Sequence, residues 1–179
     1  MTSYRRRHAR KAYDVEPRSK PRASKSLRKF TPKNPFPTNE QSRFRDEVTL
    51  WLADSDDSLK VARDNLAIEN YHIAAFYIHQ AVEKALKAAV IALTREMPAK
   101  IHVLDKLYTE VSSEIPLTEE QKDFLVELTP TYQVARYINA AGRLPRNAYT
   151  KRLAERYLNN ALPIIDAVKK RIVEGVKHE

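Results

Sequence analysis

Apolar side chains recur every three or four positions from about residue 40 onward, which is the spacing of one face of an α-helix. The most apolar stretch is residues 71–94, which contains no glycine or proline. Its apolar face combines larger side chains with Tyr71 and six alanines; the larger ones are Ile78, Val82, Leu86, Val90 and Leu93. A helix that is apolar around most of its circumference usually lies at the centre of a bundle. We therefore predict that residues 71–94 form the central helix.

Four further segments show the same periodicity and are predicted helices: 39–69, 101–115, 118–129 and about 147–177. In the first of them, the DSDD run at 54–57 indicates either a break or a solvated face. The third opens with a capping box, in which Thr118 is the N-cap and Gln121 is the third helical residue. No segment shows a convincing strand pattern. The sequence thus predicts an all-α protein, a compact bundle of about five helices.

Composition supports this prediction and excludes several classes of protein. Only 2 of the 179 residues are glycine, which leaves few tight turns and favours long helices. The chain has no cysteine, so disulfides and thiolate metal sites are excluded. No apolar run reaches the roughly 18 residues of a membrane span, and the basic N-terminus lacks the apolar core of a secretory signal. We expect a cytoplasmic protein without a membrane segment.

The positive charge of the chain is concentrated at one end. Residues 1–41 contain 12 Lys and Arg against 3 Asp and Glu, whereas the remainder is balanced, so the whole net charge of +9 lies there. Residues 1–39 also contain five prolines and few apolar side chains, a composition that cannot offset the entropy of ordering. We predict two parts, a disordered or extended basic arm (1–39) and a helical domain (40–179).

The arm has the residue types of a nucleic-acid-binding segment. Its cations can neutralise phosphates, and its aromatic side chains can stack on bases. The cations closest to the N-terminus are Arg5, Arg6, Arg7, Arg10 and Lys11. Two other interpretations remain open, a solvated tail without a function and a segment that binds an acidic protein or a membrane.

A second candidate site lies inside the helical domain. The segment 131–150 has the densest group of aromatic and arginine side chains there: Tyr132, Arg136, Tyr137, Arg143 and Arg146. The forked donors of arginine suit phosphate, and tyrosine rings offer stacking surfaces. These residues therefore predict a site for a nucleotide or RNA. The alternative is a structural Arg136 that pairs with Glu83 or Asp105.

The polar residues of the central helix have a different interpretation. His79, Glu83 and Lys87 lie on one helical face, where a polar seam between helices or a dimer contact is a better explanation than a metal or acid–base site. His102 is expected to form hydrogen bonds at the start of a helix. Neither a zinc-binding histidine motif nor a glycine-rich phosphate loop is present, so we predict no metal and no cofactor.

The order of these motifs resembles the HEPN domain (higher eukaryotes and prokaryotes nucleotide-binding). The resemblance covers roughly residues 44–175 and rests on HQAVEKALKA at 79–88, HVLDKL at 102–107, and Tyr132 with Arg136-Tyr137. It implies a helical bundle that commonly forms homodimers. It also implies a possible partner, because many members pair with a minimal nucleotidyltransferase in toxin–antitoxin modules, and many are metal-independent ribonucleases.

The ribonuclease members carry an arginine followed after four to six residues by a histidine. Here the matching arginine is Arg136, and positions 141–143 are Ala, Gly and Arg, so the expected catalytic histidine is missing. The resemblance therefore implies a module that binds RNA or a nucleotide, with a nucleotidyltransferase-type partner and without efficient catalysis. The alternatives are a metal-independent ribonuclease toxin and an RNA-associated structural protein anchored by its arm.

Overall fold

The computed structural model describes residues 40–176, with side chains from 43 to 175. All of them belong to the second of the two units into which the chain divides, Phe36–Glu179. The predicted basic arm, including Arg5, Arg6, Arg7, Arg10 and Lys11, lies outside the described residues.

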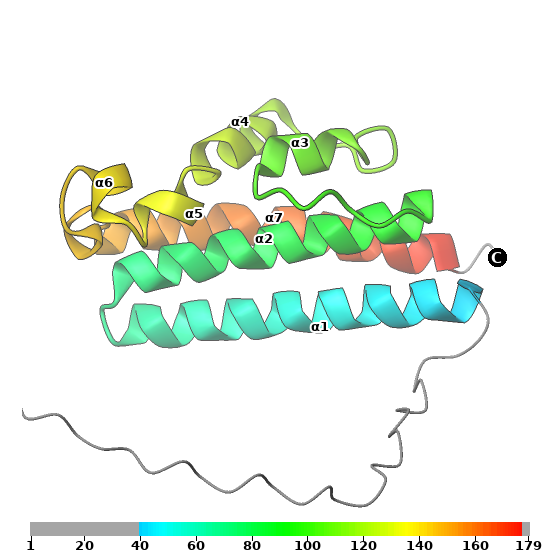
Figure 1. Cartoon of the computed structure of the whole chain (residues 1–179), viewed down its shortest axis with the longest axis horizontal. Helices are drawn as coiled ribbons and strands as arrows, with labels where there is room; N and C mark the ends of the chain where they lie inside the picture. The colour runs from blue at the N-terminus through cyan, green and yellow to red at the C-terminus, as the bar shows by residue number, and fades with distance from the viewer. Residues whose placement is uncertain (1–39, 177–179) are drawn as a thin grey trace, which may run out of the picture. The chain divides into compact units, whose positions relative to one another are not determined.

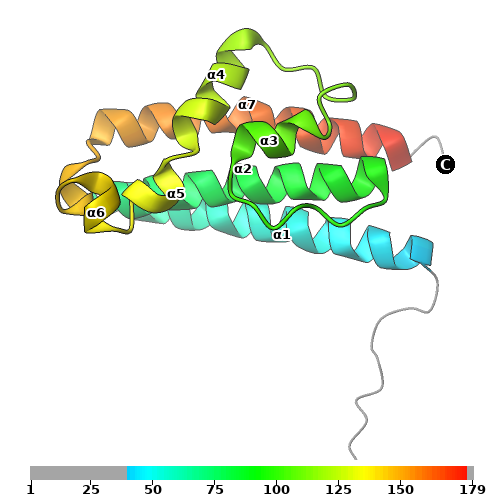
Figure 2. The ribbon, with the colours of Figure 1, turned by 45° about the horizontal axis from the view of Figure 1, so that its top comes forward.

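The described part is entirely helical, as the sequence predicted. Three long helices, α1 (Glu40–Ala67), α2 (Tyr71–Thr94) and α7 (Lys151–Val176), run side by side, with α1 antiparallel to the other two (Figure 1). The shorter helices α3 (Leu104–Thr109) and α4 (Glu119–Leu128) cover the side of α2 and α7 that faces away from α1 (Figure 2). Helices α5 (Thr131–Val134) and α6 (Ile138–Ala141) and a 3₁₀ turn (Pro145–Asn147) lie at the end where α2 and α7 begin. The five predicted helices are all present.

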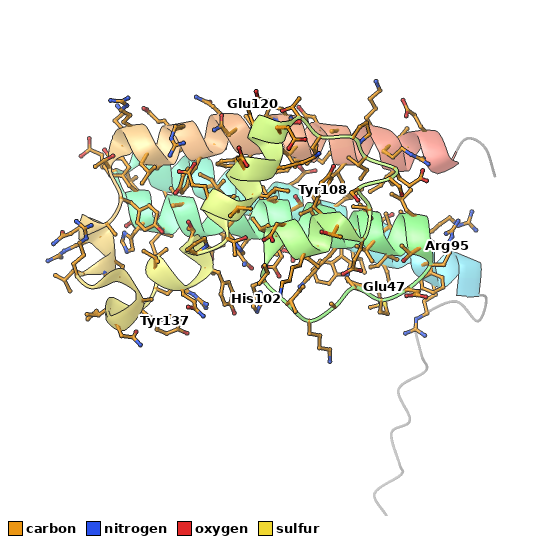
Figure 3. All side chains as sticks on the ribbon, turned by 90° about the horizontal axis from the view of Figure 1, so that it is seen from above. Glu47, Arg95, His102, Tyr108, Glu120 and Tyr137 are labelled. Atoms are coloured by element: carbon orange, nitrogen blue, oxygen red, sulfur yellow. The ribbon has the colours of Figure 1, made fainter. Side chains whose placement is uncertain are left out.

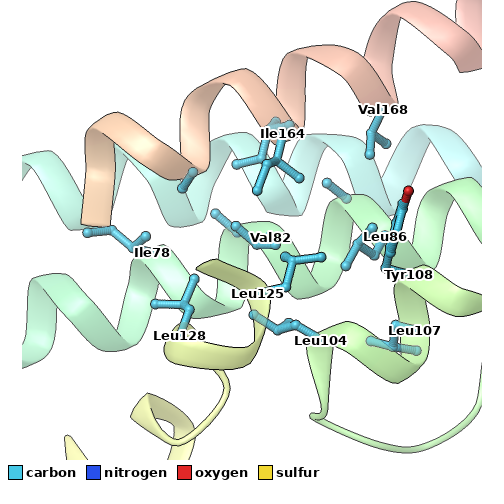
Figure 4. Packing of buried hydrophobic residues seen from close by; sticks show 14 of the residues in the cluster. Ile78, Val82, Leu86, Leu104, Leu107, Tyr108, Leu125, Leu128, Ile164 and Val168 are labelled. Carbon is cyan, nitrogen blue, oxygen red and sulfur yellow. The ribbon is translucent and has the colours of Figure 1, made fainter. Parts of the chain in front are cut away.

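Helix α2 is the centre of the bundle, because α1, α3, α5 and α7 all pack against it. Figure 4 shows its core face between the neighbouring helices, with Ile78, Val82 and Leu86 of α2, Ile164 and Val168 of α7, Leu104 and Leu107 of α3, and Leu125 and Leu128 of α4. These side chains are almost completely shielded from solvent. Burying a side chain of this size stabilises the fold by about 1.5–3 kcal/mol. The prediction of a central helix over residues 71–94 is correct.

The DSDD run does not break α1. Ser55 is buried and donates a hydrogen bond of 2.8 Å to the carbonyl oxygen of Ala81 on α2. Asp54 accepts one of 2.8 Å from Lys84, and Asp56 forms an ion pair with Lys169 on α7. The polar side chains of this run therefore connect α1 to α2 and α7 through a hydrogen bond and ion pairs.

Three predicted boundaries are wrong, including the start of α3, which is Leu104 and not Ile101. Helix α3 ends at Thr109 and not at Ile115, since the hydroxyl of Tyr108 closes the next turn by donating to the Ile115 carbonyl and accepting from the Leu117 N–H. The last helix begins at Lys151 and not near Asn147. Pro145–Asn147 forms a separate 3₁₀ turn, and the Thr150 hydroxyl accepts a hydrogen bond from the N–H of the third helical residue.

The predicted capping box of α4 is confirmed. The Thr118 hydroxyl accepts a hydrogen bond of 3.3 Å from the Gln121 N–H, and the Gln121 side chain accepts one of 2.9 Å from the Thr118 N–H. The box fixes the start of α4 and therefore the path of the chain toward Thr131, where the candidate site begins.

Candidate functional site

Arg136 follows α5, and aromatic rings surround its guanidinium group. The central guanidinium carbon lies 4.0 Å from the centre of the Tyr132 ring and 5.0 Å from those of Phe76 and Tyr137. Its Nε donates a hydrogen bond of 2.7 Å to the carbonyl oxygen of Tyr132, one helical turn earlier. Cation–π contacts with three rings and one backbone hydrogen bond therefore fix the position of the charge.

The alternative expectation, an Arg136 paired with Glu83 or Asp105, does not agree with this geometry. Among residues 43–175, the Arg136 side chain forms no ion pair, and its one hydrogen bond uses Nε. Its side chain is exposed. The two terminal nitrogens of the guanidinium are the groups that a planar anion such as phosphate binds best.

Arg136 also forms part of the wall of an open pocket of about 440 Å³. The pocket is lined by His72 and Ile73 of α2, Ala135, Arg136, Leu144, Pro145 and Arg146. Its lining is mainly apolar and includes two arginines. Burial and the nearby Arg146 both lower the pKa of His72, so this imidazole is neutral at pH 7. The pocket can thus hold a flat apolar group and a phosphate together.

The structure brings together four of the five residues predicted for this site. Tyr132 and Tyr137 contact Arg136, and Arg146 shares its pocket, whereas Arg143 is exposed and lines no part of it. Phe76 and His72 were not predicted as site residues. They lie on α2, about 60 residues before Arg136 in the sequence, and no local pattern connects the two segments.

Further along α2, the buried carboxylate of Glu83 organises a group of polar side chains. Its carboxylate accepts hydrogen bonds from Lys87 at 2.7 Å, Gln80 at 3.3 Å and the Nδ1 of His102 at 3.0–3.1 Å. Glu83 is only 4% exposed and Lys87 7%. The polar face predicted on the central helix is therefore a seam between α2 and the segment that precedes α3.

His79 belongs to the same seam, but its imidazole is neutral. Its Nε2 donates to the backbone carbonyl of His102 at 3.1 Å, and its Nδ1 has no hydrogen-bond partner, although Glu83 lies 3.7 Å away. Burial lowers the pKa of His79 to about 4, and the Glu83 charge opposes this only in part. The imidazole of His79 is neutral at physiological pH.

His102 connects the seam with Arg136. Its ring stacks on the ring of Tyr132 with 3.7 Å between the centroids and 12° between the planes. In Figure 3, His102 and Tyr137 lie along the same side of the bundle. His102 thus forms hydrogen bonds close to a helix start, as expected, and one of its partners is an acidic side chain on another helix.

Among residues 43–175, no group of three His, Asp or Glu side chains could hold a metal ion. No helix between residues 40 and 176 is long and apolar enough to cross a membrane. The positions at which the ribonucleases carry histidine include Gly142, which ends α6 with a left-handed φ of 63°, and a Cβ added there would meet no other atom within 4 Å.

A pocket of similar volume, about 430 Å³, lies near the opposite end of α2, between α1, α2 and α7. Its lining is mainly apolar, with the side chains of Arg45, Arg95 and Arg171 around it, and Arg171 is paired with Glu114. None of the predicted site residues contributes to it. The aromatic contacts of Arg136 and the neighbouring polar seam place the candidate functional site at the other pocket.

Comparisons with known proteins agree with this fold. A Methanocaldococcus jannaschii protein named as a candidate toxin, MJ1304, is 27% identical over 130 residues, which cover 67% of this chain and 84% of that protein. The crystal structure of TT1696 from Thermus thermophilus is similar with a TM-score of 0.62 and 28% identity, over 72% of this chain and 98% of that one. ST0689, described as an archaeal HEPN homologue, has a TM-score of 0.56 and 25% identity, over 70% of this chain and 97% of that one.

The profile of the HEPN domain matches residues 48–172, from the first turns of α1 to the last turns of α7. The match includes every helix of the described part and all residues of the candidate site. The chain belongs to the HEPN domain family.

Proposed function

We propose that this chain is a HEPN-domain binding module that holds the phosphate of RNA or of a nucleotide at Arg136. The module acts without efficient catalysis, and its partner is a nucleotidyltransferase-type protein. This function combines the geometry of the Arg136 pocket with the activities that the family resemblance implies.

The observation that carries the proposal is the environment of the Arg136 guanidinium. Three aromatic rings and a backbone carbonyl hold it in place, and no described carboxylate neutralises it. An exposed arginine usually loses side-chain entropy when it binds an anion, but here that loss has largely occurred already. A guanidinium held in this way is more typical of a ligand site than of a solvated surface.

The rest of the pocket suits the other parts of a nucleotide. Ile73, Leu144 and Pro145 provide apolar surface for a base or ribose, and Arg146 places a second positive charge beside the first. Residues 131–150 also carry an apolar side chain outside the pocket that is exposed to solvent, Ile138 at 61%. A second copy of the chain would bury it, so we place the interface of the expected homodimer here.

Arg136→Ala is expected to weaken the binding of a short RNA or of ATP roughly 10- to 100-fold, since a hydrogen bond to a charged group contributes about 1.5–3 kcal/mol. Arg136→Lys keeps the charge but loses the forked geometry, and an intermediate affinity is expected. Arg63→Ala is the matched control, because it removes the same charge from an exposed position on α1. Fluorescence anisotropy at low and at physiological salt measures all three. An Arg136→Ala variant that binds like wild type would contradict the proposed site.

The alternative function is a metal-independent ribonuclease of a toxin–antitoxin pair. The name of the M. jannaschii relative favours it. This alternative requires wild-type protein to degrade RNA in the presence of a chelator and Arg136→Ala to lose that activity. Binding without degradation favours the binding module.

The basic arm provides a second contact in this proposal. Its 12 Lys and Arg residues within 1–41 would bind phosphates without sequence preference. Deleting residues 1–38 distinguishes the contribution of the arm to RNA binding from that of the pocket. If the arm alone anchors the protein to RNA, as in the structural-protein alternative, the deletion abolishes RNA binding; if Arg136 is the main contact, the deletion only reduces the dependence on salt.

A further inference from the structure

The orientation of His102 determines which of its ring nitrogens carries a proton. Its Nδ1 lies 3.0–3.1 Å from both carboxylate oxygens of Glu83. An ionised carboxylate can only accept hydrogen bonds, so the proton of this interaction belongs to Nδ1. In the neutral imidazole the opposite nitrogen, Nε2, then carries a lone pair and is an acceptor.

Nε2 of His102 is available to a ligand. The His102 side chain is 42% exposed, and no residue in the described range 43–175 forms a hydrogen bond with Nε2. Within the same range, the only buried side-chain nitrogen or oxygen without a partner is Nδ1 of His79. Nε2 of His102 therefore reaches solvent, and a buried carboxylate fixes the direction in which it points.

Tyr132 places this acceptor beside the proposed phosphate site. The imidazole of His102 stacks on the Tyr132 ring at 3.7 Å, and the guanidinium carbon of Arg136 lies 4.0 Å from the same ring centre. Two groups at these distances would overlap on one face of the ring, so they occupy opposite faces. Arg136 and His102 are thus separated by one aromatic ring, with the guanidinium on one side and, on the other, a ring nitrogen that accepts hydrogen bonds when the imidazole is neutral.

Few ligands match both groups. The ligand needs an anionic group for Arg136 and, several bonds away from it, a neutral donor for Nε2. In RNA the 2′-hydroxyl is a donor next to the 3′-phosphate, and in DNA this donor is absent. Because both faces of the Tyr132 ring are covered, the sugar of such a ligand would pass along the edge of the ring.

We propose that His102 is a specificity-determining residue that accepts a hydrogen bond from a ribose 2′-hydroxyl and so makes the Arg136 site selective for RNA over DNA. Glu83 is a positioning residue, because it holds Nδ1 protonated and directs Nε2 outward. Lys87, which donates to Glu83 at 2.7 Å, offsets the charge of that buried carboxylate. This inference rests on the proposed phosphate site and adds the class of nucleic acid that it selects.

The test compares three oligonucleotides of one sequence, as RNA, as 2′-deoxy and as 2′-O-methyl chains, in equilibrium binding to the full chain. Only RNA offers the hydroxyl donor. A single neutral hydrogen bond contributes about 0.5–1.5 kcal/mol, so wild type is expected to bind RNA roughly 2- to 10-fold more tightly than the other two. His102→Phe keeps a ring that can stack on Tyr132 but has no acceptor. We expect it to reduce the RNA affinity to the level of DNA and to leave the DNA affinity unchanged.

The outcomes separate this inference from the proposed function. Equal binding of all three chains by wild type, with Arg136→Ala weakening each, would leave the phosphate site intact and overturn the role of His102. Retained RNA selectivity in a folded His102→Phe variant would overturn it as well. If no oligonucleotide binds at all, the proposed function fails and the inference with it.

Asp105→Asn, a change close to His102 in the sequence, controls for a general disturbance of the structure at the start of α3, and thermal unfolding verifies that each variant is folded. If His102→Phe does not fold, equal binding of the three oligonucleotides by wild type would still overturn the inference.

Discussion

Glu83→Ala is expected to lower the free energy of unfolding by about 3–5 kcal/mol, a large part of the stability of a domain of this size. The reason is the loss of a partner and not the loss of packing alone. Lys87 is 7% exposed and donates to Glu83 at 2.7 Å. Without the carboxylate, its ammonium group would remain buried and unpaired. His102 would lose the acceptor of its Nδ1 proton at the same time.

The double variant Glu83→Met/Lys87→Met, compared with Glu83→Met alone, distinguishes this explanation from a simple cavity, because methionine fills the space at position 83 in both. Replacing both members of a buried ion pair with apolar side chains of similar size is often neutral or stabilising. We therefore expect the double variant to be more stable than Glu83→Met, in which Lys87 stays buried without its partner; the Nδ1 of His102 lacks its acceptor in both variants. Urea unfolding curves at pH 7 provide the comparison. A Glu83→Ala variant that loses less than about 1 kcal/mol would show that water replaces the carboxylate without cost.

The buried carboxylate of Glu83 belongs to the run HQAVEKALKA at 79–88, on which the family resemblance rests. Glu83 and Lys87 are four residues apart, on the same face as His79. In an isolated helix such a pair contributes only about 0.2–0.5 kcal/mol. Here the pair is buried beneath the segment before α3 and fixes the ring of His102, so it determines how that segment lies on α2.

The sequence predicted the elements of the fold well where the signals are local. Apolar spacing identified α2, and the Thr118 capping box placed the start of α4 correctly. The end of α3 was predicted wrongly because it depends on a contact of a side chain: the hydroxyl of Tyr108 closes the turn that follows Thr109. Periodicity extends through residues 110–115, whose apolar members are still buried, and so it could not reveal the end of the helix.

The candidate site was predictable only in part, for the same reason. Tyr132 and Arg136 are four residues apart, and a local pattern is enough to bring their side chains together. The other side of Tyr132 is occupied by His102, which is 30 residues away in the sequence and is held by Glu83 from a third segment. The packing of α2 against the segment before α3 creates this arrangement, and no spacing within one segment encodes it.

His79 is expected to make the protein less stable as the pH falls from about 6.5 to about 4. In the unfolded chain His79 takes up a proton near its ordinary pKa of 6.5, whereas burial keeps the native side chain neutral until the pH reaches about 4. Between these values the unfolded state binds more protons than the native state, so acidification favours unfolding. A difference of this size in pKa corresponds to roughly 3 kcal/mol.

His79→Gln isolates this contribution from the other groups that titrate in the same range. Glutamine does not titrate, and its amide can still donate to the carbonyl oxygen of His102, which now accepts from Nε2 of His79 at 3.1 Å. The expected result is a wild-type stability that declines more steeply than that of His79→Gln between pH 6.5 and 4, with parallel behaviour above pH 7. Parallel curves over the whole range would show that the native imidazole takes up its proton as readily as the unfolded one. Glu83, only 3.7 Å from the unpaired Nδ1, would then stabilise the imidazolium strongly enough to offset its burial.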